Sequence, residues 1–307
     1  MLSVCVPIYN EEENVERIVK NIQETDLWKR SRQKEILLGI NGSTDHSAAI
    51  ARRMARADPR IRVFIIPEKS KNKAWEKMVQ ESNPISERLF FADADVILES
   101  STFSRINEAM EKSPTMAVIG ARSVPLPESN WLSIHRRMLV KGLQNLDFSE
   151  RKGSLWGQCY GIQRKDALTV QLPTDSRIAE DIFLELFFYE RSMVIPGARV
   201  HIRMPNFLDH VRQRTRGHIW VRLIKEQYPT LYERYLEIRR TRKRYEFRKI
   251  MKGATPFDLL AVALNQGAEK YAGLRAGRLI KKGKGSWPKM TSTKTLPAPY
   301  RKGQPHK

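Results

Sequence analysis

The sequence has only two cysteines among its 307 residues, Cys5 and Cys159. Two isolated thiols cannot form a zinc site by themselves and do not suggest a disulfide framework, so we expect a reducing compartment. Long apolar runs are also missing, because the longest, Leu259–Leu264, is far shorter than the roughly 20 residues of a membrane-spanning helix. No secretory signal is recognisable, since Leu2–Ile8 is short and three glutamates follow it. We therefore expect a cytoplasmic protein without a transmembrane segment.

Acidic residues are scarce in one part of the chain. Residues 239–307 contain 19 Lys and Arg against three acids, whereas residues 1–238 contain 36 against 31. The formal net charge of +21 is thus concentrated near the C-terminus. This contrast predicts a main domain over residues 1–238 and a basic extension over 239–307, disordered from about residue 281, where Lys, Gly, Ser and Pro dominate.

Apolar runs alternate with helical patterns in the first part of the chain. The runs expected to be strands are Ser3–Ile8, Glu35–Ile40, Arg62–Ile66, Arg88–Ala92 and Met116–Ala121. The first helix is expected to begin at Asn10 as its N-cap, with Glu13 completing a capping box. Strict alternation predicts parallel strands with helical crossovers on both faces. Further on, we expect helices over 131–146, 179–190, 210–235 and 256–279, and a strand over 194–202.

Three of the expected strands end in polar segments, at residues 9–11, 41–45 and 93–95. In sheets of this kind, ligands bind beyond the carboxyl ends of the strands. Asp93 and Asp95 lie two residues apart in extended backbone, so their carboxylates can face the same point. Two such oxygen ligands, with room for water and phosphate, suit Mg²⁺ or Mn²⁺ that bridges a diphosphate. A solvated strand end, where Asp is common in turns, is the alternative.

An acidic pair, Glu180 and Asp181, precedes an apolar helical segment at 182–189. Acids in a first helical turn can simply stabilise the helix dipole. A carboxylate here can also act as a general base that takes the proton of an acceptor hydroxyl. The sequence leaves both interpretations open.

The order of four segments resembles the family-2 glycosyltransferases of the GT-A fold. The segments are VPIYNE at 6–11, NGSTD at 41–45, DAD at 93–95 and ED at 180–181, and the resemblance covers roughly residues 1–220. It implies an α/β fold with a Rossmann-like, mostly parallel sheet and helices on both faces. The charge and composition of residues 239–307 add a basic helical or disordered extension after this domain. The resemblance also implies a metal-assisted, inverting, hexosyltransferase-like enzyme that takes a UDP- or GDP-sugar as donor.

The resemblance also implies roles for residues of the nucleotide pocket. Pro7, Tyr9 and Glu11 would line this pocket, Asn41 would contact the base, and Lys71 would touch the nucleotide. Positions 40 and 41 depart from the polar or acidic residues usual in the family, so the choice between uridine and guanosine stays open. For Lys71, a surface position in a lysine-rich loop is the alternative.

The catalytic and metal-binding roles follow from the same resemblance. Asp95 would bind the metal directly, and Asp93 would contact the ribose or a metal-bound water. Asp181 matches the catalytic base, with Glu180 beside it. His201 is a candidate third metal ligand on a late strand, although a lone histidine is more often packed or on the surface.

A further segment, QRTRG at 213–217, resembles the Q-x-x-R-W signature of processive synthases but has Gly217 in place of the tryptophan. We therefore expect a non-processive enzyme. Arg214 or Arg216 could neutralise the diphosphate of the donor, and a basic helix face is the alternative.

The basic extension suggests a partner. Two basic segments, Arg239–Lys252 and Arg275–Lys307, flank the apolar run Pro256–Leu264. This pattern suits an anionic membrane surface. Many acceptors of the family are lipid-linked, so we expect an acceptor glycan or glycolipid and a role in cell-envelope synthesis. A tail that only improves solubility is the alternative.

Two other functions are alternatives to a glycosyltransferase. The first is a nucleic-acid-binding protein that uses the basic tail, but the basic runs lack interleaved aromatics, which argues against it. The second is a sugar nucleotidylyltransferase, which would have a glycine-rich loop after its first strand, and residues 7–11 contain no glycine.

Overall fold

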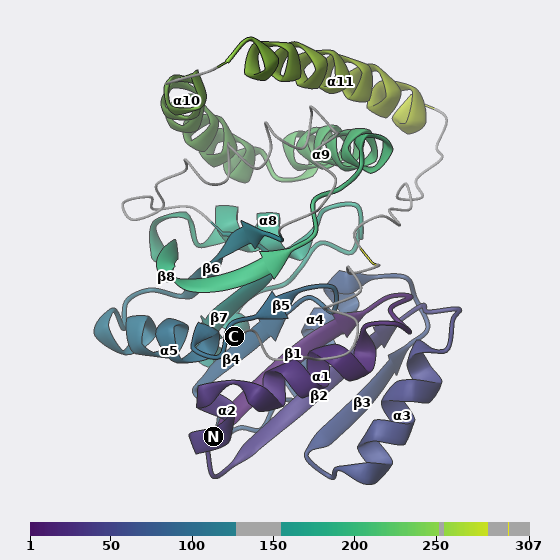
Figure 1. The fold of residues 1–307 in the computed structure, drawn as a ribbon, viewed down its shortest axis with the longest axis vertical. Helices are drawn as coiled ribbons and strands as arrows, with labels where there is room; N and C mark the ends of the chain where they lie inside the picture. Colours follow the sequence, from purple (N-terminus) through teal and green to yellow (C-terminus); the bar gives the residue numbers. More distant parts are fainter. Residues whose placement is uncertain (127–154, 252–254, 282–293, 295–307) are drawn as a thin grey trace. The chain divides into compact units, whose positions relative to one another are not determined.

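The computed structural model describes residues 1–126, 155–251, 255–281 and 294 (Figure 1). These residues fall into two compact units, the first comprising 1–123 and 155–202 and the second comprising 124–126 and the described residues from 203 to 294. The helix expected over 131–146 and most of the segment expected to be disordered from 281 lie outside the described residues. The division of the chain at residue 238 stays a prediction.

The first unit is built on a mixed sheet with the strand order β3-β2-β1-β4-β7-β6-β8-β5. Its strands are β1 Leu2–Ile8, β2 Lys34–Asn41, β3 Ile61–Ile66, β4 Arg88–Ala92, β5 Ile97–Leu98, β6 Val118–Pro125, β7 Cys159–Gln163 and β8 Ser192–Ile202. The α/β architecture expected from the alternating pattern is confirmed.

The sheet changes character at β4. The neighbours β3, β2, β1 and β4 are all parallel, as the alternation predicted. Beyond them, β7 runs antiparallel to both β4 and β6, and β5 runs antiparallel to β8. Since Ala92 pairs with Cys159, β7 begins at the edge where β4 ends. Segments that precede β7 are therefore brought to the carboxyl edge of the parallel strands.

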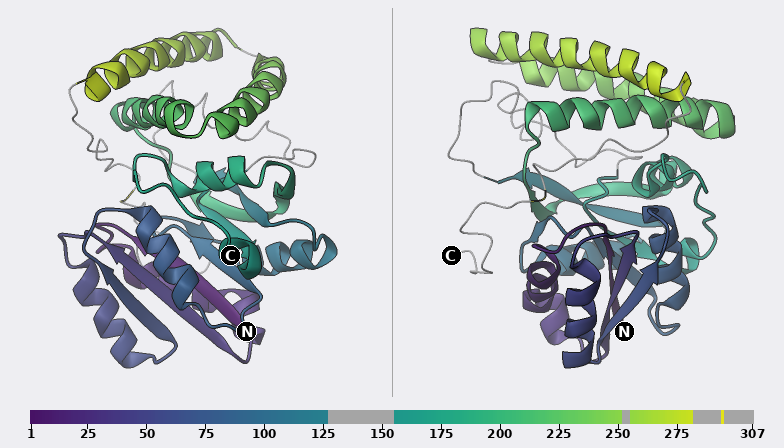
Figure 2. Two further views of the ribbon diagram at one scale, coloured as in Figure 1. Left: turned by 180° about the vertical axis from the view of Figure 1, so that it is seen from behind. Right: turned by 90° about the vertical axis from the view of Figure 1, so that its right-hand side faces the viewer.

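Helices cover both faces of this sheet. They are α1 Val15–Glu24, α2 Asp26–Arg30, α3 Ser47–Ala57, α4 Lys71–Glu81, α5 Thr102–Lys112, α7 Arg164–Ala167, α8 Glu180–Phe187 and the 3-10 turn η1 Tyr189–Arg191. Figures 1 and 2 show α1 and α3 on one face and α4 on the other. This arrangement follows from right-handed crossovers, because the connections β1 to β2 to β3 run one way along the sheet and the connection to β4 returns.

The expected start of the first helix is wrong. Asn10 has a φ of 52°, in the left-handed region, so it cannot lead directly into a helix. The helix α1 begins at Val15 with Asn14 as its N-cap. Asn10 instead accepts a hydrogen bond at Oδ1 from the backbone N–H of Thr44, 2.8 Å away, and so belongs to the loop beyond the sheet.

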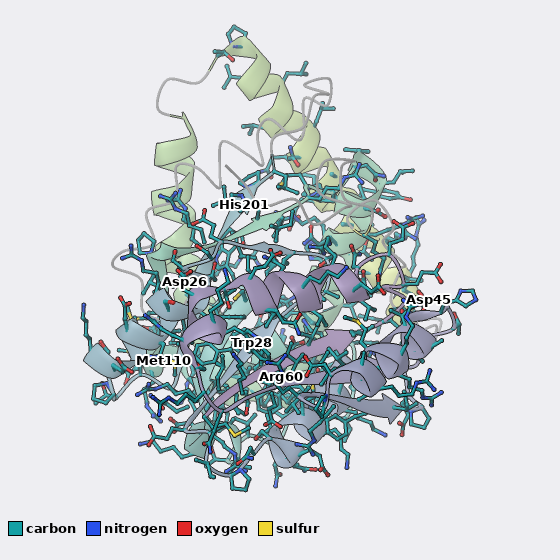
Figure 3. All side chains as sticks on the ribbon, turned by 60° about the horizontal axis from the view of Figure 1, so that its bottom comes forward. Asp26, Trp28, Asp45, Arg60, Met110 and His201 are labelled. Carbon is teal, nitrogen blue, oxygen red and sulfur yellow. The ribbon has the colours of Figure 1, made fainter. Side chains whose placement is uncertain are left out.

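The core lies between the sheet and its helices. Apolar side chains of β1, β2 and α1 pack in one buried cluster that includes Val4, Val6, Ile36, Ile18 and Ile22. At the amino ends of the strands, the ring of Trp28 on α2 lies 5.2 Å from the Lys34 ammonium and 5.6 Å from the Arg60 guanidinium (Figure 3). These cation–π contacts lie at the end of the sheet opposite its polar loops.

The described residues of the second unit form the helices α9 Phe207–Gln227, α10 Pro229–Met251 and α11 Pro256–Lys281. The single helix expected over 210–235 is two helices, because Pro229 lacks an N–H and starts a new helix as a first-turn residue. The helix α11 packs along α9, with Ala268, Ala272 and Ala276 buried. Among the helices of the described ranges, none combines the length and apolarity that crossing a bilayer requires.

Candidate active site

Two polar loops meet where β1 and β2 end. The backbone N–H of Asn10 donates to Ser43 Oγ (3.1 Å), and that of Glu11 donates to Ser47 Oγ (2.8 Å). The side chain of Asn10 binds the backbone of Thr44. The segments 9–11 and 41–45 therefore form one connected surface at the carboxyl edge of the sheet.

Gly42 lets a third segment approach this surface. It has a φ of +63°, and a Cβ at this position would lie 2.7 Å from the backbone nitrogen of Lys69. A larger residue would therefore be strained and would push the segment 67–70 away. The close approach leaves the Lys69 ammonium 4.3 Å from the ring centroid of Tyr9. An aromatic ring and a cation thus stand together beside the loop that contains Asn41.

Asn41, the last residue of β2, has an unusual side chain. It is only 4% exposed, and its Oδ1 has no hydrogen-bond partner among the described residues. Buried polar atoms are nearly always hydrogen-bonded, because leaving one unpaired costs about 1–3 kcal/mol. This oxygen is therefore suited to accept a hydrogen bond from a ligand. Pro7, on the neighbouring strand, pairs in register with Gly39.

A lysine joins residues 93–95, here called the aspartate loop, to the acidic pair at 180–181. Lys71, the first residue of α4, places its ammonium 2.8 Å from Asp93 Oδ1 and 2.6 Å from Glu180 Oε1. Asp93 directly follows β4, and Glu180 is the first residue of α8. Two segments nearly 90 residues apart are thereby held around one cation. The alternative of Lys71 as a simple surface lysine does not describe these contacts.

Asp181 is positioned by a glycine. A Cβ at Gly157 would lie 2.2 Å from Asp181 Oδ2 and 2.5 Å from its Cβ, so only glycine fits against this side chain. The next residue, Gln158, accepts the backbone N–H of Asp93 at 2.9 Å. Asp181 Oδ1 accepts the backbone N–H of Ile182 (2.8 Å). The segment before β7 therefore contacts both the aspartate loop and the acidic pair.

The two carboxylates of the acidic pair, Glu180 and Asp181, have raised pKa values. Burial is the main cause that raises the pKa of Glu180 to about 7; the charges of Asp181 and Asp93 add to it, and Lys71 opposes it. Burial also raises the pKa of Asp181, against the attraction of Lys71. For Lys71 itself, burial alone would lower the pKa, but Asp93, Glu180 and Asp181 together raise it well above its ordinary value. Glu180 Oε2 is buried and has no hydrogen-bond partner among the described residues.

Aromatic rings of β4, α4 and β7 pack together beside Lys71 and the carboxylates that it contacts. Phe91 on β4 stacks against Trp75 on α4 and Tyr160 on β7, with centroids 5.6 and 5.1 Å apart. The indole N–H of Trp75 donates to the hydroxyl of Tyr160 at 2.9 Å. One turn away, Asn72 Nδ2 donates to the carbonyls of Pro173 and Ile178 and holds the segment that leads to Glu180. Sequence reasoning missed these residues, although Trp75 lies at i+4 from Lys71.

A buried arginine of α1 binds the backbone of the aspartate loop. Arg17 on α1 donates to the carbonyl of Ala94 (2.6 Å) and to that of Val96 (2.5 Å). Burial lowers the pKa of Arg17 to about 10, against the attraction of Asp95 and Glu11. Glu11 is 8% exposed, and its role in nucleotide binding stays a prediction. A charged residue on the inner face of α1 was the signal that could have identified Arg17.

The expected metal ligands supply oxygen and nitrogen donors. Asp93 and Asp95 leave the end of β4 together, and this donor set fits a magnesium or manganese ion that takes its other ligands from water and phosphate. His201 on β8 contacts Glu99 at 3.1 Å, and its backbone pairs with that of Ile97. Within the described ranges, no group of three or more His, Cys, Asp and Glu residues is arranged to hold a metal. The metal-binding role of His201 stays a prediction.

The two arginines expected near the diphosphate belong to the second unit. Arg214 on α9 lies 3.6 Å from Glu269 of α11. Burial lowers the pKa of Arg216 to about 10, against the attraction of Asp209. Their contact with a donor stays a prediction.

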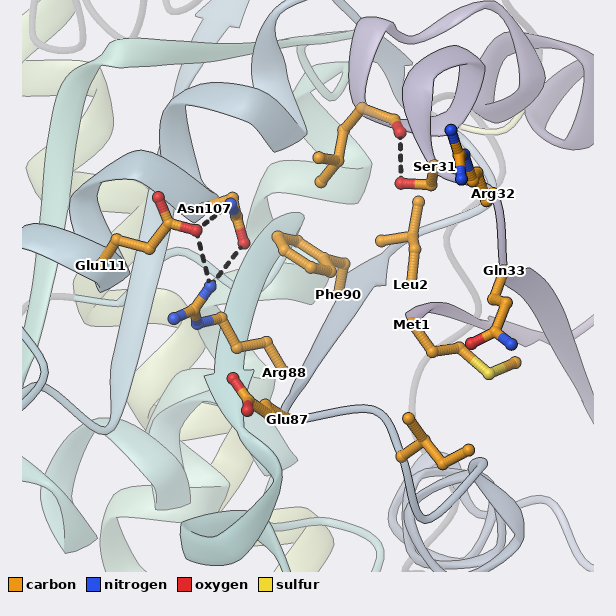
Figure 4. Close-up of a pocket in the computed structure, with 12 residues that line it drawn as sticks. Met1, Leu2, Ser31, Arg32, Gln33, Glu87, Arg88, Phe90, Asn107 and Glu111 are labelled. Carbon is orange, nitrogen blue, oxygen red and sulfur yellow. Dashed lines mark hydrogen bonds and ion pairs between the residues drawn. The ribbon is translucent and has the colours of Figure 1, made fainter.

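A separate cavity of about 670 Å³ lies at the amino ends of β1 and β4 (Figure 4). Arg88 there donates to Asn107 Oδ1 at 2.9 Å and Glu111 Oε1 at 3.1 Å. Because Arg88 begins β4 and Asp93 follows its end, this cavity and the carboxylate cluster lie at opposite ends of the strand. It is therefore not the site that the polar loops form.

Known structures share this fold at low sequence identity. The mannosyltransferase PcManGT from Pyrobaculum calidifontis, in complex with GDP-Man and Mn²⁺, is 18% identical with a TM-score of 0.56, over 92% of this chain and 79% of that one. TarS 1–349 from S. aureus is 16% identical with a TM-score of 0.51, over 73% of this chain and 64% of that one. GalNAc-T7 with UDP, GalNAc and Mn²⁺ is 13% identical with a TM-score of 0.51, over 75% and 52%. At such identities the likeness shows the fold alone.

The family can be read from the sequence itself. Comparison with curated proteins gave no match. The family model for glycosyl transferase family 2 matches residues 3–173, more than half of the chain. This match includes the loops at 9–11 and 41–45, Lys71 and the aspartates at 93 and 95. The resemblance seen in the sequence is thereby confirmed, and the chain belongs to glycosyl transferase family 2.

Proposed function

We propose that this protein transfers a hexose from a nucleotide-diphosphate-sugar to an acceptor hydroxyl, with inversion at the anomeric carbon. The observation that carries the proposal is the double contact of Lys71 with Asp93 and Glu180, at 2.8 and 2.6 Å. It joins the residue expected on the donor side to the acidic pair expected on the acceptor side. A displacement between two bound substrates needs donor-side and acceptor-side groups close together, and this contact supports that arrangement.

The donor nucleotide would lie on the connected loops beyond β1 and β2. The ring of Tyr9 with Lys69 offers an aromatic face and a positive charge, and Asn41 offers an unpaired buried oxygen. Uracil and guanine each present a ring N–H that this oxygen could accept. The solved structures with GDP-Man and with UDP are in keeping with either base.

A divalent ion would complete the donor site. Asp93 and Asp95 would hold Mg²⁺ or Mn²⁺, which when bound supplies positive charge to stabilise the departing diphosphate. The ammonium of Lys71 lies 2.8 Å from Asp93 Oδ1 and would add positive charge beside the same phosphates. Arg17 fixes the backbone on either side of Asp95 and would keep this carboxylate oriented.

Asp181 would act as the general base. The acceptor oxygen attacks the anomeric carbon, its proton passes to the Asp181 carboxylate, and the bond from carbon to the diphosphate oxygen breaks with the electron pair on the diphosphate. The raised pKa of Asp181 makes it a better proton acceptor than an ordinary aspartate. Glu180 would keep Lys71 in place beside it.

The finer features of the activity are proposals as well. A non-processive reaction follows from Gly217, which stands where processive synthases have tryptophan. The acceptor would be a glycan or glycolipid of the cell envelope, reached at the cytoplasmic face of a membrane. The two free, buried cysteines, Cys5 and Cys159, are in keeping with a reducing compartment.

A thermal-shift screen with uridine, guanosine and thymidine diphosphates and Mn²⁺ tests the donor class. One nucleotide should raise the melting temperature, and its sugar conjugates should then release the diphosphate when acceptors are added. Absence of binding to all three nucleotides in the presence of Mn²⁺ or Mg²⁺ would contradict the proposal.

A further inference from the structure

The helix α11 has an exposed apolar stripe. Large apolar side chains point to solvent at positions spaced by three, four and seven residues, which places them on one helix face. These are Leu260 (48% exposed), Leu264 (43%), Tyr271 (57%) and Leu274 (66%). Ala263 and Gly267 fill the gaps between them and are also exposed. We call these six residues the α11 stripe.

The opposite face of α11 is already used for packing. Ala268, Ala272 and Ala276 are buried, and a Cβ added at Gly273 would lie 3.5 Å from the ring of His218 on α9. Glu269 pairs with His218 at 3.3 Å. Small residues therefore attach α11 to α9, whereas the large apolar residues face outward. Attachment to the helical unit does not account for the α11 stripe.

The stripe continues onto α9 through a groove of about 570 Å³. Its lining includes Phe207, Leu208 and Val211 of α9 beside Leu264 and Tyr271 of α11. Phe207 and Leu208 are 42% and 65% exposed. Exposed apolar surface that extends over two helices in this way is typical of interaction sites.

Basic side chains frame this apolar surface. On the helical wheel, Lys270 and Arg275 stand on either side of the α11 stripe, and Arg278 and Lys281 continue its line toward the end of the helix. Arg212 lines the groove on α9. The whole segment 203–307 contains 26 Lys and Arg against seven acids. A second copy of the same charge would be repelled, so the electrostatics favour an anionic partner.

We propose that the α11 stripe, with the groove beside it and its basic frame, docks the protein on an anionic lipid bilayer. The apolar side chains would enter the boundary between headgroups and acyl chains, and the Lys and Arg residues would contact lipid phosphates. The docking itself is independent of catalysis. Its purpose, to bring the site to an acceptor carried by a lipid, rests on the proposed function.

The test is co-sedimentation of the full chain with vesicles of phosphatidylcholine, with and without phosphatidylglycerol. We expect binding only where phosphatidylglycerol is present. The triple variant Leu264→Gln, Tyr271→Gln and Leu274→Gln should bind at least about tenfold more weakly, since it removes apolar area from the bilayer. Its matched control changes three exposed apolar residues of the first unit, Ile65→Gln, Ile85→Gln and Leu168→Gln, and should bind like the wild type.

A second pair of variants tests the charges. Each Lys or Arg near an anionic surface contributes about fivefold to partitioning. The variant Lys270→Gln, Arg278→Gln and Lys281→Gln should therefore lose about a hundredfold. The exposed basic residues of the control variant, Lys20→Gln, Arg52→Gln and Lys112→Gln, lie on the first unit, and this variant should lose far less.

Several results would overturn the docking proposal. One is equal affinity for vesicles with and without phosphatidylglycerol. Another is an equal loss of vesicle affinity in the test variants and their controls. A third is vesicle binding that RNA abolishes and that the α11 stripe variant leaves unchanged. A dimer in light scattering that the stripe variant dissociates, without vesicle binding, would instead assign the surface to a second copy. The Asp181→Asn variant should bind vesicles normally. Vesicle binding without sugar transfer would contradict the proposed function alone, and transfer to a soluble acceptor without vesicle binding would contradict the docking alone.

Discussion

Replacement of Lys71 by methionine should destabilise the protein in a pH-dependent manner. The change keeps the length of the side chain but removes the ammonium that lies 2.8 Å from Asp93 and 2.6 Å from Glu180. Removing one partner of a buried ion pair costs about 3–5 kcal/mol. The Lys71 side chain is 35% exposed and Glu180 only 2%, so water offsets part of the loss. We expect a decrease in the free energy of unfolding of about 2 kcal/mol near pH 8.

The effect should shrink in acid. The folded-state pKa of Glu180 is about 7, above its ordinary value of 4.5, so the folded protein binds this proton more readily than the unfolded chain does. The stability of the wild type therefore falls as the pH rises through this window. Without Lys71 the pKa of Glu180 should rise further, and the fall should continue to higher pH. Near pH 5 Glu180 is protonated with or without Lys71, and the difference should be less than about 1 kcal/mol.

Urea unfolding of the wild type and the Lys71→Met variant near pH 5 and near pH 8 measures both quantities. The control is Lys73→Met on the same helix, because Lys73 is exposed and its ion pair among the described residues is with the exposed Glu68. An exposed pair of this kind contributes at most about 1 kcal/mol, and its contribution should not follow the titration of Glu180. A Lys71→Met variant as stable as the wild type near pH 8 would contradict the stabilising ion pairs of Lys71 with Asp93 and Glu180.

Three further changes test the proposed chemistry. Asp181→Asn should retain donor affinity and lose transfer by about a thousandfold or more, since the general base is gone; near-normal turnover would refute the assignment. Asp95→Ala should abolish metal-dependent donor binding in calorimetry, and an unchanged affinity for donor with Mn²⁺ would refute it. Gly157→Ala should lower kcat more than donor affinity, because its Cβ would lie 2.2 Å from Asp181 Oδ2. Gly217→Ala is the control, because its nearest neighbour would be Trp220 Nε1 at 3.8 Å; equal kinetics for these two variants would contradict the crowding argument.

The sequence predicted those parts of the fold that depend on local patterns. Apolar runs identified the four parallel strands, since a strand buried on both faces is continuously apolar. The aspartates at 93 and 95 were assigned to a strand end because they directly follow such a run. The acidic pair was found as a helix start, and α8 indeed begins at Glu180.

Features that depend on tertiary packing were not predicted. Lys71 had two interpretations of equal standing, because its contact with Glu180 exists only once α8 packs against α4. Asn10 looked like a helix cap, since its left-handed backbone depends on its contacts with the loop at 43–44. Arg17 received no role from the sequence, because its function follows only from the carbonyls of Ala94 and Val96 that accept its hydrogen bonds.

The reversal of direction at β7 has an evolutionary consequence. Because β7 starts where β4 ends, and β6 runs antiparallel to β7, both ends of the connection between them emerge at the carboxyl edge of the sheet. Insertions, deletions and substitutions in that connection can therefore accumulate without a change in any core strand. Descendants of one ancestral enzyme could retain the same nucleotide chemistry while acquiring new acceptors through this single interval of the gene.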